Sequence, residues 1–140
     1  MQTRFFISTI ITILCLPFVF PSVCLSQEDD TAAPSISIED AAICRGVIDR
    51  TPVEKGDVFP RDVKKLFFFT RVTGAKEDTE VIHEWYYKGK VISRVFLPVR
   101  SAGWRTYSSK TILPEYTGEW KVQIVTKDGE LLKQIYFAVH

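Results

Sequence analysis

Seven short runs of β-branched and aromatic residues follow one another from residue 40 to the C-terminus of this 140-residue chain. Gly, Pro or charged residues separate the runs, and no run keeps a helical period for ten residues. Short strands at this spacing are typical of an antiparallel sandwich. The sequence therefore predicts one all-β domain over residues 40–140, an immunoglobulin-like antiparallel β-sandwich of about seven strands. The predicted strands are residues 41–48, 66–73, 80–88, 90–99, 104–113, 119–126 and 131–139.

Alternation along these runs predicts which side chains face the core, because successive side chains of a strand point to opposite sides of the sheet. In 80–88 the inward set includes His83 and Trp85, and a core tryptophan on a middle strand is typical of immunoglobulin-like sandwiches. The last two runs are expected to be neighbouring antiparallel strands with one buried face. Their inward sets are Trp120, Val122 and Ile124, then Leu131, Ile135, Phe137 and Val139.

The connections between the runs include two predicted hairpins and one long loop. Lys88-Gly89-Lys90 and residues 127–130, which contain an Asp-Gly pair suited to a type I′ turn, are the hairpins. Residues 49–62 are expected to form the longest loop, because Pro52, Gly56 and Pro60 exclude a central strand. Phe59 within this loop is predicted to fold back onto the core.

The N-terminus has the layout of a secretory leader. Arg4 precedes an apolar stretch from Phe5 to Phe20, and Cys24 and Ser26 place small residues before a cut at residue 26. The alternative is an uncleaved membrane anchor. Residues 27–39 are acidic and without period, which predicts a flexible tether. We therefore expect an exported protein, periplasmic or extracellular, that meets a membrane only if the leader is retained.

Charge and cysteine content argue against several function classes. Removing residues 1–26, with one base and no acid, leaves 17 basic residues of the chain's 18 against 17 acidic ones, so nucleic-acid binding is not expected. The predicted mature chain holds one cysteine, Cys44, which we interpret as a small buried residue, with an intermolecular bridge or reactive thiol as the alternative. Cys44, His83 and His140 are too few and too scattered for structural zinc, and no metal or other cofactor is predicted.

The predicted strand 104–113 carries the densest group of side chains that could bind a ligand. Trp104, Arg105, Tyr107, Ser108 and Lys110 combine flat rings with cations and a hydroxyl, as surfaces for sugars or anionic ligands do. The alternative is an outer strand whose Trp104 packs under a loop and whose Arg105 and Lys110 are either solvated or paired with Glu84 or Glu115. No catalytic residues are predicted, because His83 is expected to be inward and hydrogen-bonded, for instance to Ser108 or Ser109.

The order of several short motifs resembles a bacterial family known as Domain of Unknown Function 2914. The motifs are Cys44-x-x-Val47, Arg50-x-Pro52, Phe67-Phe68-Phe69, His83-x-Trp85, Trp104-Arg105-Thr106-Tyr107-Ser108-Ser109-Lys110, Gly118-x-Trp120-x-Val122 and Gly129…Phe137. The resemblance spans residues 41–139 and implies an exported or membrane-attached bacterial β domain. It implies no known activity and no catalytic residues.

The sequence thus favours a non-catalytic binding or accessory module of the cell envelope, whose partner is an unidentified protein or glycan. Two alternatives stay open. One is a small envelope hydrolase that uses His83 with Ser108 or Ser109, which would require His83 to be exposed in a cleft. The other is a structural spacer domain.

Overall fold

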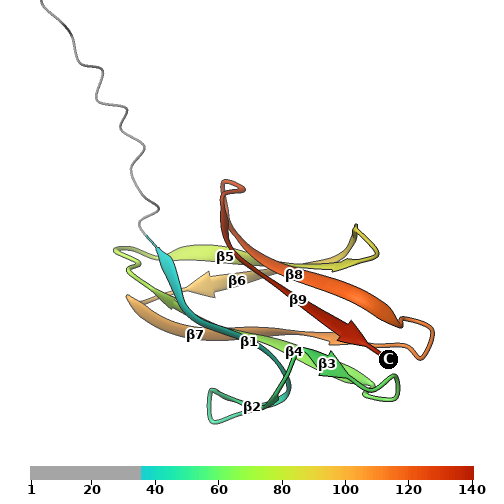
Figure 1. The fold of residues 1–140 in the computed structure, drawn as a ribbon. Coiled ribbons are helices and arrows are strands. Elements are labelled where there is room, and N and C mark those ends of the chain that lie inside the picture. The colour runs from blue at the N-terminus through green and yellow to red at the C-terminus, as the bar shows by residue number, and fades with distance from the viewer. Residues whose placement is uncertain (1–35) are drawn as a thin grey trace, which may run out of the picture. The chain divides into compact units, whose positions relative to one another are not determined.

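Two β-sheets packed face to face make up residues 36–140, the part of the chain that the computed structural model describes (Figure 1). Sheet A has the strand order β2-β1-β4-β7, and sheet B has the order β3-β9-β8-β5-β6. The strands are β1 (Ser37–Ile48), β2 (Thr51–Lys55), β3 (Val58–Phe59), β4 (Lys65–Thr73), β5 (Thr79–Tyr87), β6 (Lys90–Val99), β7 (Gly103–Thr111), β8 (Gly118–Thr126) and β9 (Leu131–Val139).

All seven predicted strands are present, so the prediction of an all-β sandwich is confirmed. The first, second and fifth of these long strands (β1, β4 and β7) lie in sheet A, and the other four lie in sheet B. This distribution is related to the immunoglobulin arrangement, in which an extra strand can join the sheet that holds the central tryptophan strand. Trp85 of β5 is that tryptophan, and it is fully buried.

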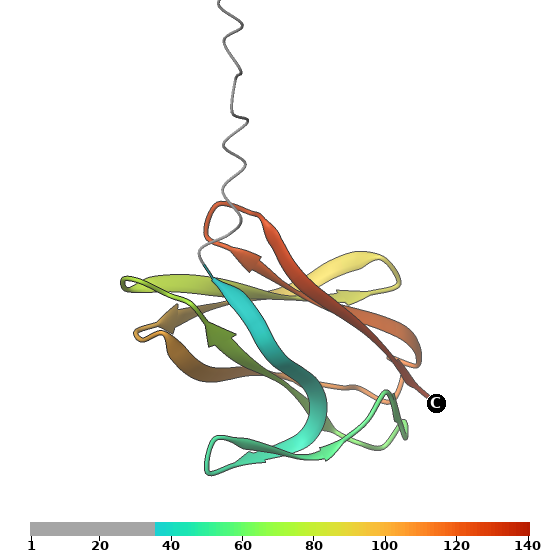
Figure 2. The ribbon, with the colours of Figure 1, turned by 60° about the vertical axis from the view of Figure 1, so that its left-hand side comes forward.

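The prediction of a long loop over residues 49–62 was wrong, because this segment forms two short strands and raises the count to nine. Both are edge strands. Pro52 has no backbone N–H to donate, and an edge strand tolerates it because the strand has only one neighbour. Phe59 is buried, as predicted, and pairs in parallel with Val139. β1 bends along its length, so that its end and β2 turn away from the rest of sheet A (Figure 2).

The turns differ in part from the predicted types. Lys88 and Gly89 form a two-residue hairpin with positive φ at both positions, as a type I′ turn requires. Asp49 and Arg50 form a second such hairpin between β1 and β2, which was not predicted. In the last hairpin only Gly129 has positive φ, and its N–H donates to the Thr126 carbonyl at 2.9 Å. That turn is therefore type I followed by a left-handed glycine, and the type I′ prediction was wrong.

The core lies between the sheets and is built around aromatic rings. Trp85 meets Phe68 and Phe137 edge to face, and Phe137 stacks on Trp120 at 5.6 Å between ring centres. The inward faces of β5 and β8 follow the predicted alternation. In β9 the prediction for Leu131 was wrong, because the pairing shifts between Ile124 and Val125 and leaves Leu131 half exposed. Leu132, which has no partner in that register, packs against the core instead.

β1 begins earlier than predicted, at Ser37, so the last residues of the predicted tether belong to a strand. Ile36 is buried and Ile38 packs on the core, which explains the extension. The predicted leader (1–26) and most of the predicted tether (27–35) lie outside the described residues. Within residues 36–140 we find no helix that could cross a membrane.

Candidate functional site

A buried polar network lies at the centre of the sandwich. The two ring nitrogens of His83 face the Ser108 Oγ at 2.8 Å and the Thr70 Oγ1 at 3.1 Å, and Trp85 Nε1 donates to the same Ser108 oxygen at 3.0 Å. All four residues are buried. Because Thr70 and Ser108 belong to sheet A and the other two to sheet B, the network joins the sheets.

The neutral His83 ring has one donor and one acceptor nitrogen, and each faces a hydroxyl that can take the complementary role. Both ring nitrogens are therefore satisfied in either tautomer, while Ser108 Oγ also accepts from Trp85. Burial lowers the pKa of His83 to about 3, so the imidazole is neutral at physiological pH. The prediction of a buried, hydrogen-bonded His83 is confirmed. His83 does not lie in an open cleft, which was the condition for the hydrolase alternative.

The tip of the β1–β2 hairpin lies over the outer face of sheet A. Phe69 points to this outer face, since its neighbours Phe68 and Thr70 point into the core, yet Phe69 is only 2% exposed. Arg50, at the hairpin tip, lines a pocket together with Phe69, and its guanidinium carbon lies 5.4 Å from the centre of the Trp104 ring. The bend in β1 thus places Arg50, at the tip of the β1–β2 hairpin, over Trp104 of β7, which is distant in sequence.

Two adjoining hollows share Arg50, Phe69 and Arg105, and we name them together the β7 groove. The larger hollow has a volume of about 230 Å³ and the smaller about 110 Å³. The larger is lined by Arg50, Phe69, Pro98, Trp104, Arg105, Thr106 and Tyr107, and the smaller by Asp40, Arg50, Thr51, Pro52, Phe69, Arg71 and Arg105. The groove therefore combines aromatic rings with three arginines and one carboxylate.

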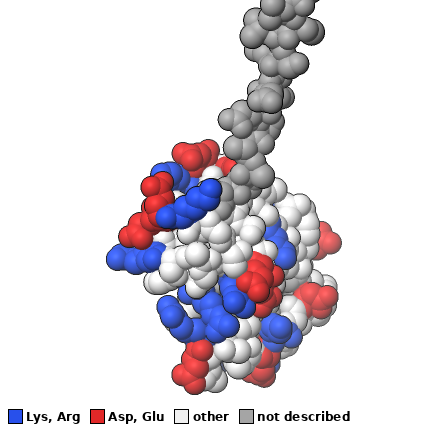
Figure 3. Space-filling model, turned by 90° about the vertical axis from the view of Figure 1, so that its left-hand side faces the viewer, with Lys and Arg blue, Asp and Glu red and all other residues white. Residues whose placement is uncertain are grey.

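The charges of the groove favour an anion. Arg71 pairs with Glu39 at 3.1 Å, whereas Arg50 and Arg105 make no salt bridge within residues 36–140. Arg71 stands directly opposite Arg105 on β7, where like charges repel, and directly opposite Asp40 on β1, where opposite charges attract. Figure 3 shows that basic side chains gather on the lower half of one face, with acidic ones around them. An anionic group bound between the arginines would relieve this repulsion.

Three of the five predicted site residues come together in the groove: Trp104, Arg105 and Tyr107. Tyr107 is 48% exposed, while Trp104 also packs on the core. Ser108 does not belong to this surface, because alternation turns it inward to His83 and leaves it 4% exposed. Lys110 is near the far end of β7 and does not line the groove, so the structure does not bring Ser108 and Lys110 together with the other three predicted residues.

The predicted alternative pairings of the cations are absent from the described part of the chain. Glu84 binds Arg94 at 2.7 Å, and neither Arg105 nor Lys110 forms a salt bridge with Glu84 or Glu115. Cys44 is fully buried, in agreement with its interpretation as a small core residue, and burial raises the pKa of its thiol. The thiol is therefore both covered and protonated at neutral pH.

Sequence reasoning missed Arg50 and Phe69. Asp49 and Arg50 form the two-residue turn that joins β1 and β2, and such a spacing between two strands can indicate a hairpin. The hairpin was not recognised because the turn contains no glycine, although Arg50 has a φ of 59°, where glycine is the usual residue. Asp49, Glu54, Lys64 and Lys88 share this left-handed conformation, so the case for Arg50 rests on its position over Trp104.

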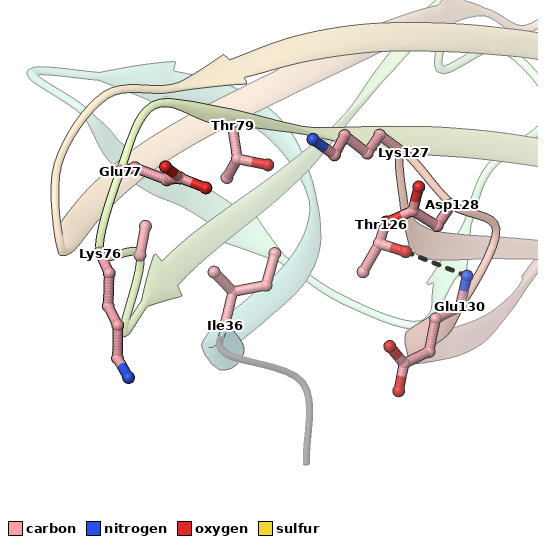
Figure 4. A pocket seen from close by; sticks show the side chains of 9 residues that line it. Ile36, Lys76, Glu77, Thr79, Thr126, Lys127, Asp128 and Glu130 are labelled. Atoms are coloured by element: carbon pink, nitrogen blue, oxygen red, sulfur yellow. Dashed lines mark hydrogen bonds between the residues drawn. The ribbon is translucent and has the colours of Figure 1, made fainter. Parts of the chain in front are cut away.

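A third hollow, of about 370 Å³, lies at the end of the sandwich where β1 begins (Figure 4). Its lining mixes Lys76 and Lys127 with three acidic residues and contains no aromatic ring. The Thr126 hydroxyl there accepts a hydrogen bond from the backbone N–H of Glu130, so this polar group is already satisfied. Within residues 36–140 no group of His, Cys, Asp and Glu side chains is arranged to hold a metal ion.

One family model matches part of the chain. Residues 78–139 match the model of a family described as a protein of unknown function (DUF2914), whereas residues 41–77, over which the motif resemblance also extended, lie outside the match. No curated protein matches the chain. The matched segment holds β5 to β9, with His83, Trp85, Trp104, Arg105 and Tyr107. Over this segment the chain matches the DUF2914 family, which supports the predicted resemblance.

Proposed function

We propose that this protein is an exported, non-catalytic binding module of the cell envelope, and that its partner, a protein or a glycan, docks at the β7 groove. One observation carries the proposal: the hairpin tip holds Arg50 over Trp104 in a hollow that Arg105 also lines, and neither arginine forms a salt bridge in the described part of the chain. Unpaired cations that line a hollow attract anionic ligands.

The groove has the composition of a recognition surface. Tyrosine, tryptophan and arginine are the residues that most often dominate binding energy, and here all three line one hollow. Arginine also offers donors in a planar fork that matches carboxylates. The spacer alternative predicts no such concentration of binding side chains, and the hydrolase alternative would need an accessible base.

The experiment that tests this function is capture of the partner by the full exported chain. We would crosslink envelope extracts to the wild-type protein, identify the captured molecules, and probe a glycan array in parallel. Arg105→Ala should leave the free energy of unfolding within about 0.5 kcal/mol, since Arg105 is exposed. Tyr107→Ala should cost about 1 kcal/mol, since its half-exposed ring packs edge to face on Phe67. Both variants should reduce capture sharply.

Arg61→Ala is the matched control, because Arg61 is exposed but lies outside the groove. Capture that is equal for all variants would refute the groove as the binding site. If Arg105 were structural, its truncation would destabilise the protein by roughly 3–5 kcal/mol with no selective loss of capture.

A further inference from the structure

The edge strand β7 differs from the other three sheet edges. It pairs with β4 from Gly103 to Thr111 without any shift in register. β2 is short and contains Pro52, and β3 has two residues. β6 contains Pro98, and its ladder with β5 is irregular. Proline, bulges and short length are the usual means of protecting an edge, and β7 has none of them.

The outer side of β7 offers free backbone groups. Among residues 36–140, β7 pairs with β4 alone, and no other hydrogen bond between backbone groups involves Gly103–Thr111. The Gly103 carbonyl, at the start of the strand, accepts from the Ser101 hydroxyl at 3.4 Å. Such an edge is a ready template for an extended segment that adds to the sheet, in which main-chain hydrogen bonds give affinity and side-chain pockets give selectivity. The larger hollow of the β7 groove lies directly at Trp104–Tyr107.

Charge decides which segment fits. β7 carries Arg105 and Lys110 and no acidic residue. Arg71 stands opposite Arg105, and Arg50 lines the same hollow. A second copy of β7 would bring more positive charge to this edge and would be repelled, whereas an acidic strand would be attracted.

We propose that β7 binds an extended acidic segment of a partner protein, which adds to sheet A as a further strand and places a carboxylate beside Arg50 and Arg105. This inference rests on the proposed binding function and names the class of its partner. It also gives a role to Lys110, which lies roughly 17 Å along the strand from Arg105 at ~3.3 Å per residue. Lys110 is on the opposite face of sheet A from Arg105, because it stands opposite the inward Leu66. A strand laid along β7 can reach Lys110 with a carboxylate on its second face, whereas a compact ligand held in the groove does not.

The test uses the full exported chain and a synthetic peptide as long as β7, nine residues. It consists of valine and threonine with two glutamates five positions apart, so that the two carboxylates point to opposite faces of the added strand, as Arg105 and Lys110 do on β7. One control peptide has lysine in place of glutamate, and another keeps glutamate but has alternate backbone nitrogens methylated. Hydrogen exchange is followed strand by strand, and affinity is measured for wild type, Arg105→Ala, Lys110→Ala and the control Arg61→Ala. An acidic oligosaccharide, oligogalacturonate, is tested beside the peptides.

We expect the acidic peptide to slow exchange in β7 and not in β6, and both control peptides to fail. Arg105→Ala and Lys110→Ala should each weaken binding by about tenfold or more, the loss of one charge-assisted contact. Binding without protection of β7, equal binding of the methylated peptide, or no binding of the acidic peptide would overturn strand addition. Oligogalacturonate bound through Arg105 alone would overturn it too but leave the proposed function standing. Loss of that function would instead be shown by envelope capture that is insensitive to Arg105 and Tyr107.

Discussion

The Nδ1 atom of His83 in β5 lies 2.8 Å from the Ser108 hydroxyl oxygen in β7, so a buried hydrogen bond joins the two sheets. The same hydroxyl oxygen receives the indole N–H of Trp85. Ser108 therefore satisfies two buried polar groups of the facing sheet. Buried polar groups are costly when they lose a partner, and this fixes how the two sheets are placed on each other.

Ser108→Ala should destabilise the protein by roughly 2–6 kcal/mol, because it leaves the His83 and Trp85 nitrogens unsatisfied at about 1–3 kcal/mol each. The neighbouring Ser109 is exposed, so Ser109→Ala is the matched control and should change the free energy of unfolding by about 0.5 kcal/mol or less. Urea denaturation of the two variants measures both values. Equal stabilities would show that the network contributes nothing to the fold.

Acid should destabilise the protein through His83. The folded-state pKa is about 3 and the usual value is 6.5, so between these values the unfolded chain binds a proton that the folded chain does not. Stability is complete above pH 6.5 and falls as the pH decreases, by at most about 1.4 kcal/mol per pH unit. Urea titrations at several pH values would reveal this slope.

Glu84 also makes stability depend on pH, but in a lower pH range than His83. Burial opposes ionisation of Glu84, but hydrogen bonds from Gln123 and Tyr86 and the charge of Arg94 outweigh it and hold the pKa of that carboxyl below its usual 4.5. Its stabilisation is present above pH 4.5 and is lost only at lower pH. The slope between pH 4.5 and 6.5 should thus vanish in His83→Gln, and a slope that persists there would assign it to other groups.

Trp85 and Trp120 should be the most costly aromatic truncations. Both are buried, and replacement by Ala should cost about 3–5 kcal/mol, a large part of the ~5–15 kcal/mol available to such a domain. Tyr136, which is 63% exposed on β9, serves as the control, with an expected loss of about 1 kcal/mol or less. Chemical denaturation that gives losses below ~1 kcal/mol for both tryptophans would contradict the core assignment.

Replacing Arg50 should change the stability of the turn and the capture of a partner separately. Its φ of 59° disfavours any residue with a Cβ, so Arg50→Gly should be more stable than Arg50→Ala by about 1 kcal/mol. Both variants lose the guanidinium above Trp104 and should capture the envelope partner poorly. Thermal melts compare the stabilities. A glycine variant that is no more stable than the alanine variant would argue against stored strain at this turn.

Export predicts a shortened chain. If the leader is cut where the small residues Cys24 and Ser26 indicate, mature protein begins near Gln27. Intact-mass measurement of exported protein determines its first residue. Protein that still carries Met1 would favour the membrane-anchored alternative.

Much of the fold could be predicted because strand patterns are local. Alternation in β5 and β8 placed His83, Trp85 and Trp120 in the core, since a side chain's direction in a strand depends only on its position along that strand. The short strands in 49–62 were missed because each is stabilised by its neighbour rather than by its own residues. Leu131 was misplaced because a register shift arises between strands and leaves no mark in either one.

The sequence by itself determined the all-β sandwich and the concentration of Trp104, Arg105 and Tyr107 on one strand, because these follow from composition and a period of two. Only the tertiary structure decided that Ser108 serves the core, that Lys110 lies away from the groove, and that Arg50 joins Trp104. These relationships depend on the order of strands in the sheets and on the bend of β1. Both are set by packing between residues distant along the chain, which no local pattern encodes.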